Sequence, residues 1–155
     1  MRIIDCFQSE YAFLSNFWPS PVVFNGQEWP TVEHAFQASK TLNEGERELI
    51  RNATTPREAK ELGRKVLNMR PAWEEHKADI MLELLRLKFS QNKALRDRLL
   101  ATGNAVLIEG NTRHDNIWGD CRCDRCRDIH GENLLGRLLM RVRKELRNAH
   151  TIPSR

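Results

Sequence analysis

The pattern of apolar and polar positions predicts a small β-hairpin near the start of the chain. Two short runs, residues 22–24 and 27–29, flank Asn25 and Gly26. An Asn-Gly pair readily adopts the positive φ angles of a type I′ turn, which joins adjacent antiparallel strands. We therefore expect a two-stranded hairpin over residues 22–29.

Helical periodicity accounts for most of the remaining chain, since apolar residues recur at spacings of three and four in five stretches. One stretch has a typical helix start, with Thr55 as the cap, Pro56 at the first helical position and Glu58 completing a capping box. Another is expected to end at Gly103. The predicted helices cover residues 32–42, 56–66, 73–89, 93–101 and 132–148.

Residues 105–109 form an apolar run that predicts a buried strand. Residues 110–131 are polar and lack periodicity, and such a long irregular stretch inside a compact domain is unusual and often functional. Helices with one hairpin and one internal strand favour the α+β class over alternating βαβ units. No linker rich in Gly, Pro or Ser divides the chain. We expect one helix-rich α+β domain over residues 1–155, with a small β-hairpin or sheet.

The charge is unevenly distributed along the 155 residues, whose formal net charge is +4. Residues 1–50 hold three basic and seven acidic side chains, whereas the remainder holds 22 basic and 14 acidic ones. The basic remainder could attract the phosphates of a nucleotide or a nucleic acid. Ordinary solvated helix faces explain the same charges, and both interpretations stay open.

Several classes of function lack support. No apolar run approaches the roughly 18 to 20 residues that span a bilayer, so no membrane partner is expected. The chain has no Walker A loop, no GxGxxG, no HExxH and no GxSxG, which argues against ATP hydrolysis, dinucleotide redox chemistry and serine hydrolysis. Three of the four cysteines lie within six residues, unlike a disulfide framework, and this favours a reducing, cytoplasmic setting.

Glu33, Gln37 and Lys40 form a polar stripe on the first predicted helix, at positions i, i+4 and i+7. Seven residues of helix rise about 10.5 Å, so Glu33 and Lys40 do not simply pair. They could line two ends of one pocket with Gln37 between them. An exposed polar face is the alternative.

A second group lies in the polar stretch after the predicted buried strand. Glu109, Asp115 and Asp120 offer carboxylates, and Trp118 offers an aromatic face. A carboxylate can stabilise an oxocarbenium-like transition state or activate water, and an aromatic ring can stack on a flat heterocycle. The alternative is a tight polar turn with Trp118 inserted in the core.

The third group is Cys121, Cys123, Cys126 and His130. Three thiolates and one imidazole are a sound tetrahedral zinc set, and a metal held by four ligands from one stretch would be structural. Free thiols beside neighbouring arginines are the alternative. The remaining histidines, His114 among them, are expected to make ordinary surface or polar contacts.

Longer motifs resemble the NADAR or YbiA-like family. Residues 13–17 and 29–40 resemble its opening motifs. Its closing motifs resemble residues 107–111, 115–120 and 131–143. They appear in order and cover about residues 7–145, the expected core of the domain. The resemblance implies a YbiA-like fold and an N-glycosidase that hydrolyses ribosyl N-glycosides, acting on early riboflavin-pathway intermediates or on ADP-ribosylated guanine in nucleic acid.

The resemblance also makes two segments the preferred site: the stripe of Glu33, Gln37 and Lys40, and the loop from Asp115 to Asp120. Glu33 and Asp120 are expected to stabilise charge and to transfer protons. Lys40 would anchor a 5′-phosphate or attack a ring-opened ribose aldehyde to form a Schiff base, which requires a neutral amine. The expected substrate-binding residues are Asn16, Phe17, Gln37, Asp115, Trp118 and Gly119. No cofactor is required for these steps.

Two other classes of protein remain open. A binding module could hold NAD or ADP-ribose without cleaving it, through the same aromatic and phosphate contacts. A nucleic-acid binder could use a zinc-pinned loop in which Arg122, Arg125 and Arg127 contact phosphates. Release of free base over time would separate the enzyme from both.

Overall fold

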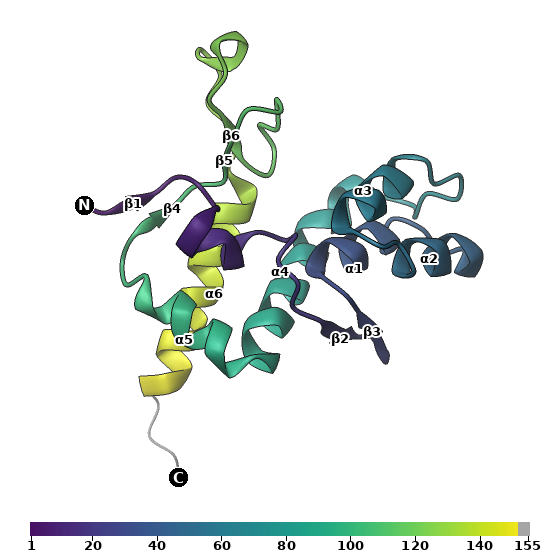
Figure 1. Ribbon diagram of the computed structural model, residues 1–155, viewed down its shortest axis with the longest axis horizontal. Coiled ribbons are helices and arrows are strands. Elements are labelled where there is room, and N and C mark those ends of the chain that lie inside the picture. The colour runs from purple at the N-terminus through teal and green to yellow at the C-terminus, as the bar shows by residue number, and fades with distance from the viewer. Residues whose placement is uncertain (152–155) are drawn as a thin grey trace. The chain divides into compact units, whose positions relative to one another are not determined.

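The computed structural model describes residues 1–151, which divide into two compact units. The helical unit comprises residues 16–92, and the terminal unit combines residues 1–15 with the chain from residue 93 onward. Each unit has its own helices and paired strands, so each is described by itself (Figure 1).

The helical unit is built around a short helix, α1 (Val32–Ala38), that contacts every other helix of the unit (Figure 1). All seven residues of α1 are buried, as expected for a helix that is packed on all sides. The other elements are β2 (Val22–Phe24), β3 (Gln27–Trp29), α2 (Glu44–Arg51), α3 (Pro56–Arg64) and α4 (Trp73–Gln91).

The terminal unit carries two pairs of short parallel strands beside its helices. Its elements are β1 (Ile3–Ile4), the 3-10 helix η1 (Ser9–Leu14), α5 (Lys93–Ala101), β4 (Val106–Leu107), β5 (Gly110–Asn111), β6 (Asp120–Cys121), the 3-10 helix η2 (Asp124–Cys126) and α6 (Leu134–Thr151). Strand β1 pairs with β4, and β5 pairs with β6. Helix α6 contacts both α5 and β4, and the segment with β5 and β6 extends from its N-terminal end (Figure 1).

The predicted hairpin is confirmed with its turn. Val22 pairs with Trp29 and Phe24 with Gln27, and Asn25 and Gly26 have φ angles of 51° and 77°. These angles match a type I′ turn. Val22 and Trp29 are buried, so one face of the hairpin contributes to the core.

The five predicted helices are all present, but the first of them ends earlier than predicted and the structure contains a further helix, α2, that was not predicted. The first predicted helix ends at Ala38 rather than at residue 42, because Thr41 enters an antiparallel bridge with Met69. Lys40 therefore follows the helix instead of lying on it. Helix α2 was not predicted, since Ile50 is its only buried residue and supplies no apolar repeat.

The predicted strand at 105–109 is reduced to the two residues of β4, and the polar stretch at 110–131 contains β5, β6 and η2. Helices combined with three separate two-stranded sheets confirm the α+β class and the helix-rich fold. The single domain over residues 1–155 stays a prediction.

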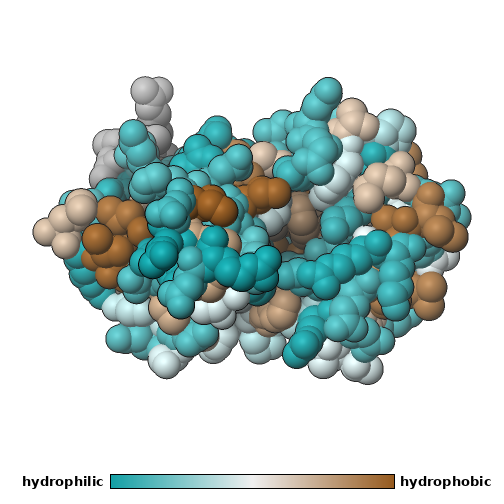
Figure 2. Space-filling model, turned by 90° about the horizontal axis from the view of Figure 1, so that it is seen from above, coloured by the Kyte–Doolittle hydropathy of each residue, from teal (hydrophilic) through white to brown (hydrophobic). Residues whose placement is uncertain are grey.

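The apolar side chains visible on one face of the molecule are dispersed. On the face shown in Figure 2, hydrophilic residues cover most of the surface and apolar residues form small, separate groups. Within residues 1–151, none of the helices has the length and apolar character that crossing a membrane would require.

Candidate functional site

Helix α1 buries a carboxylate and an amide side by side. Thr31 caps the helix by accepting a hydrogen bond from the His34 amide through Oγ1. One turn of helix separates Glu33 from Gln37, and Gln37 Nε2 donates to Glu33 Oε1 at 2.8 Å. The two side chains are only 7% and 4% exposed. The exposed polar face considered from sequence is therefore wrong for these two residues.

Gln37 is also held tightly by α3. A Cβ atom built on Gly63 would lie 1.9 Å from Gln37 Oε1, so only glycine lets α3 approach so closely. Gln37 Oε1 is buried and has no hydrogen-bond partner. Buried polar atoms are nearly always hydrogen-bonded, so an unpartnered amide oxygen marks a position where a donor is expected.

Lys40 is half-buried just beyond the end of α1. Burial lowers the pKa of Lys40, while the negative charge of Glu33 opposes that change. The positive charges of Arg64 and Lys60 lower the pKa further. A lysine with a lowered pKa more often presents the neutral amine that nucleophilic chemistry needs.

Asn16 belongs to the same neighbourhood. Its carbonyl oxygen accepts a hydrogen bond from the Glu33 amide at 3.2 Å, so the backbone of Asn16 lies against the first turn of α1. Its side-chain Oδ1 is a second buried oxygen without a hydrogen-bond partner. Phe17, the next residue, is 39% exposed. The helical unit thus brings Asn16, Glu33 and Gln37 together, with Lys40 near Glu33.

In the terminal unit, Asp115 shapes its own loop. Its Oδ1 accepts hydrogen bonds from the amides of Ile117 and Trp118 at 3.1 and 2.9 Å. Asn111 Oδ1 in turn accepts from the Asp115 amide at 3.2 Å. Both side chains make the local turns that Asn and Asp typically stabilise.

The same loop is tied to the start of α6 through backbone hydrogen bonds. The amide of Asn133 donates to the Gly119 carbonyl at 3.1 Å, and the amides of Leu134 and Leu135 donate to the carbonyls of Ile117 and Trp118 at 3.0 and 2.9 Å. These bonds satisfy amides at the helix terminus that lack partners within the helix.

Asp120 and Glu109 differ in their surroundings. Asp120 Oδ1 accepts from the Gly131 amide at 3.0 Å, and its Oδ2 lies 3.3 Å from Arg122 Nε. Burial raises the pKa of Glu109, although its ion pair with Arg113 opposes that change. A carboxylic acid with a raised pKa is suited to proton transfer. Glu109 was noted in the sequence but was not assigned a role, and its place directly after a buried strand was the available signal.

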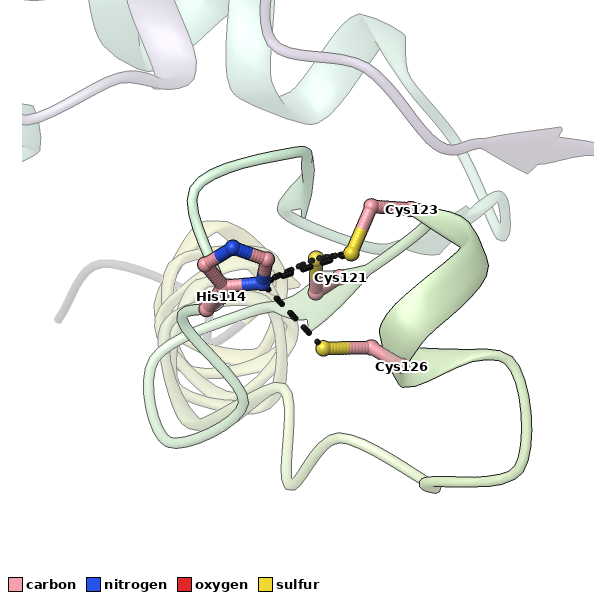
Figure 3. Close-up of side chains that lie close together, drawn as sticks. All are labelled: His114, Cys121, Cys123 and Cys126. Atoms are coloured by element: carbon pink, nitrogen blue, oxygen red, sulfur yellow. Dashed lines mark hydrogen bonds between the residues drawn. The ribbon is translucent and has the colours of Figure 1, made fainter.

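The thiol cluster has a different histidine from the predicted one. His114, Cys121, Cys123 and Cys126 place their ligand atoms within 4.8 Å of one another (Figure 3), and among the side chains that the structure describes, residues 1–149, this is the sole such group. His130 does not belong to it, contrary to the sequence prediction, and the expectation of an ordinary contact for His114 is wrong. Because β5 pairs with β6, the segment that begins at Cys121 lies beside the loop that contains His114. The spacing of these residues along the sequence does not reveal this proximity.

Two open pockets have none of the predicted catalytic residues in their lining, although Gly110 and Arg122, which line the first one, contact Asp120. One of about 520 Å³ lies in the terminal unit and one of about 480 Å³ in the helical unit. The first is lined by Asp5, Cys6, Gln8, Gly110, Asn111, Thr112, Arg113 and Arg122. The second is lined by Pro19, Pro21, Glu28, Pro30, Arg51 and Asn52.

Buried or partly buried carboxylates and a lysine of lowered pKa on an α+β scaffold are typical of enzymes that use acid–base or amine chemistry. The family model of the NADAR domain matches residues 6–147, and the chain belongs to the NADAR family.

Its relatives define the activity further. The chain is 42% identical to N-glycosidase YbiA of Escherichia coli (strain K12) over 138 residues, covering 88% of this chain and 82% of the relative. It is 37% identical to Riboflavin biosynthesis protein VVA0006 of Vibrio vulnificus over 137 residues, which cover 88% of this chain and 36% of that one.

The NMR structure of Escherichia coli YbiA matches with a TM-score of 0.85 and 38% identity, covering 100% of this chain and 92% of the other. With the family established, the protein is an enzyme of the N-glycosidase class, a hydrolase acting on N-glycosyl compounds.

Proposed function

We propose that this N-glycosidase cleaves the ribosyl N-glycosidic bond of a nucleotide-like substrate, with early riboflavin-pathway intermediates as the first candidate. The observation that carries the proposal is the buried polar group of the helical unit. There Glu33 contacts the side chain of Gln37 and the backbone of Asn16, and the side-chain oxygens of both of these residues have no hydrogen-bond partner. Two free acceptors suit the hydroxyl donors of a ribose. The name of the Vibrio vulnificus relative supports the riboflavin-type substrate.

In this proposal Glu33 stabilises the positive charge that develops at the anomeric carbon. Glu33 as a whole is only 7% exposed, so little water screens its charge, and Gln37 donates a hydrogen bond to one of its carboxylate oxygens. A preorganised charge in a site with little water stabilises a transition state far more than the same charge in bulk water. Gln37 and Asn16 bind the sugar in this scheme, and Phe17 packs against the base.

Lys40 has two roles open to it. As a nucleophile, its neutral Nζ attacks C1 of the ring-opened sugar, the base departs as its amine, and water then hydrolyses the lysine imine to release the sugar and restore the amine. As an anchor, the protonated lysine binds the 5′-phosphate. The lowered pKa of Lys40 favours the nucleophile.

Residues of the terminal unit complete the proposal. We assign acid–base work to Asp120 and binding of the base to Asp115, Trp118 and Gly119. Asp120 already accepts a hydrogen bond from Gly131, so Asp120→Asn tests a catalytic role against a purely structural one. Loss of turnover with unchanged thermal stability supports the catalytic role, and loss of both supports the structural one.

ADP-ribosylated guanine in nucleic acid is the second candidate substrate, favoured by the 22 basic side chains against 14 acidic ones after residue 50. The scheme needs only water and side chains, without a cofactor in the reaction. We place the protein in the cytoplasm, because its four cysteines form no disulfide and a reducing compartment keeps thiols in that state. We propose no membrane partner.

The test offers both candidate substrates to the purified protein and follows released base and ribose phosphate by chromatography. Cleavage of the pyrimidine-type riboflavin intermediate supports the first candidate, and cleavage of ADP-ribosyl guanosine alone supports the second. Binding without release of base would leave a binding module and overturn the proposal.

Glu33→Gln keeps the shape of the side chain and removes its charge. We expect turnover to fall by roughly 10²-fold or more, as for other losses of transition-state stabilisation. Glu61→Gln is the matched control, because Glu61 is exposed in the same unit. Equal turnover in the two variants would remove Glu33 from the mechanism.

A further inference from the structure

The thiol cluster of the terminal unit has the geometry of a closed metal site. The Nδ1 atom of His114 lies 3.3 Å from Cys123 Sγ, 3.5 Å from Cys126 Sγ and 4.0 Å from Cys121 Sγ. The Sγ atoms of Cys121 and Cys123 are 3.3 Å apart. Figure 3 shows the ring nitrogen of His114 facing all three sulfurs.

These separations fit a tetrahedral zinc. Bond lengths of about 2.3 Å to sulfur and 2.0–2.1 Å to nitrogen place the ligand atoms of a tetrahedron roughly 3.5–3.8 Å apart. The three distances from His114 and the distance between Cys121 and Cys123 span 3.3 to 4.0 Å and bracket that range, and all four ligand atoms lie within 4.8 Å of one another. Only small shifts of the four side chains are needed for an ion to sit at bonding distance from all four ligand atoms.

The backbone holds the cluster in place from separate elements. Cys121 lies in β6, and its amide donates to Asn116 Oδ1 at 2.9 Å. Cys126 ends η2, and its amide donates to the Cys123 carbonyl at 3.0 Å. These backbone hydrogen bonds position Cys121 and Cys126 and leave their sulfur atoms available as metal ligands.

His114 adopts an unusual backbone conformation at the cluster. Its φ angle is +64°, in the left-handed region that few residues other than glycine occupy. Strain of this kind persists where the surroundings hold it, often at ligand sites. The turn at His114 is what directs its ring toward the thiols.

We propose that His114, Cys121, Cys123 and Cys126 bind one structural Zn²⁺. Thiolates and imidazole together suit zinc, whereas oxygen-rich sets suit magnesium or calcium. Four protein ligands leave no open position for a substrate or a water, so the ion has a structural role. Two of the sulfurs, those of Cys121 and Cys126, belong to residues only 3% and 5% exposed.

The ion would close the loop that carries the residues of the terminal unit to which we assign acid–base work and binding of the base. His114 and Cys121 directly flank residues 115–120, which include Asp115, Trp118, Gly119 and Asp120. Joining the two ends of this segment through one ion lowers the entropy that the loop loses on ordering. This consequence for catalysis rests on the proposed function, whereas metal binding does not.

The first test measures metal and thiols in the reduced protein purified without a chelator. We expect about one equivalent of zinc, since one tetrahedral set holds one ion. Cys6 is exposed and lies outside the cluster, so one thiol should react quickly and three more only after chelation. Metal-free protein with four fast thiols, or a full equivalent of copper or iron, would overturn the proposal.

The second test uses paired variants. His114→Asn removes the imidazole while keeping a residue type that tolerates the left-handed region, and His130→Asn is its control. Cys126→Ser is paired with Cys6→Ser. We expect the first member of each pair to lose zinc to a competing chelator at least about tenfold more readily, and the controls to match the parent protein.

If a cluster variant does not fold, the absorption spectrum of the cobalt-substituted parent protein still tests the proposed site. Replacement of zinc by Co²⁺ should give the absorption of tetrahedral cobalt with sulfur-to-cobalt charge transfer. Octahedral cobalt without that band would contradict the site, as would zinc loss on changing His130 alone. Because these readouts need no turnover, they stand even if the proposed activity fails.

Discussion

At the scale of single residues, the surroundings of Lys40 shift the pKa of its amine in the direction that the proposed nucleophilic role requires. Burial lowers its pKa, and Glu33 limits that change. Arginine stays protonated and cannot form an imine, although it binds a phosphate well. The two roles of Lys40 therefore respond differently to one substitution.

We expect Lys40→Arg to abolish turnover if Lys40 is the nucleophile and to keep much of it if Lys40 is an anchor. For the nucleophile, the rate should rise with pH as the amine loses its proton, with a midpoint below the ordinary lysine pKa of 10.5. Borohydride added during turnover should trap a sugar on the Lys40 peptide. A normal rate and no adduct would contradict the imine.

His34 makes a different, structural contribution at the same scale. It is 1% exposed, its Nε2–H donates to the Ala53 carbonyl at 3.0 Å, and its Nδ1 accepts from the Thr31 hydroxyl at 2.8 Å. These partners suit the neutral ring. Burial lowers the pKa of His34 below its ordinary value of 6.5, partly offset by the Ala53 carbonyl and the charge of Glu58.

Because the folded pKa of His34 is lowered, the unfolded chain binds its proton first as the pH falls. The contribution to stability is complete well above pH 6.5 and is lost as the pH falls from there through the lower folded pKa. Melting temperatures measured from pH 7.5 to 5 should drop in the parent protein and in the exposed-site control His76→Gln. A smaller drop is expected in His34→Gln, and an unchanged one would contradict this assignment.

At the scale of elements, the contact between α1 and α3 depends on Gly63. Alanine in place of a helical glycine ordinarily stabilises by about 1 kcal/mol. Here the added Cβ would meet Gln37 Oε1 at 1.9 Å and Gln37 Cδ at 2.7 Å inside a packed contact. Overpacking of this kind typically costs about 1–3 kcal/mol.

We expect Gly63→Ala to destabilise the protein by about 1–2 kcal/mol in denaturant unfolding, since the clash exceeds the gain in helix propensity. Gly45→Ala in α2 is the control, because its Cβ would come no closer than 3.2 Å to another atom. Adding Gln37→Ala should remove most of the penalty. A stabilised Gly63→Ala would show that α3 moves away freely.

Elements with strong local signals could be predicted, and elements made by distant contacts could not. The conformations of the Asn25-Gly26 turn and of the Thr55 cap are determined by residues close together in the sequence. Strands β5 and β6 are two residues each and exist through pairing across the intervening loop. The early end of α1 likewise follows from the distant partner Met69.

At the scale of the whole molecule, the family and its activity followed from motifs, and so did the three cysteines of the thiol cluster, whereas its histidine did not. Residues 29–40 and 131–143 carry long patterns that the family comparison supports. His114 has no suitable spacing to the cysteines, and only the folded loop brings it to them. The roles of Glu33, Lys40 and Asp120 remain predictions for the variants above.

The bonds between α6 and the loop before it bear on how a phosphate would be recognised. A helix N-terminus commonly binds anions, because its free amides and its dipole attract negative charge. Here the amides of Asn133, Leu134 and Leu135 already donate to the carbonyls of residues 117–119. The first amides of α6 thus already have partners in the protein's own backbone. Under the proposed function, we therefore expect lysine or arginine side chains, rather than this helix end, to neutralise the phosphate of the substrate. Its affinity should accordingly weaken as salt concentration rises.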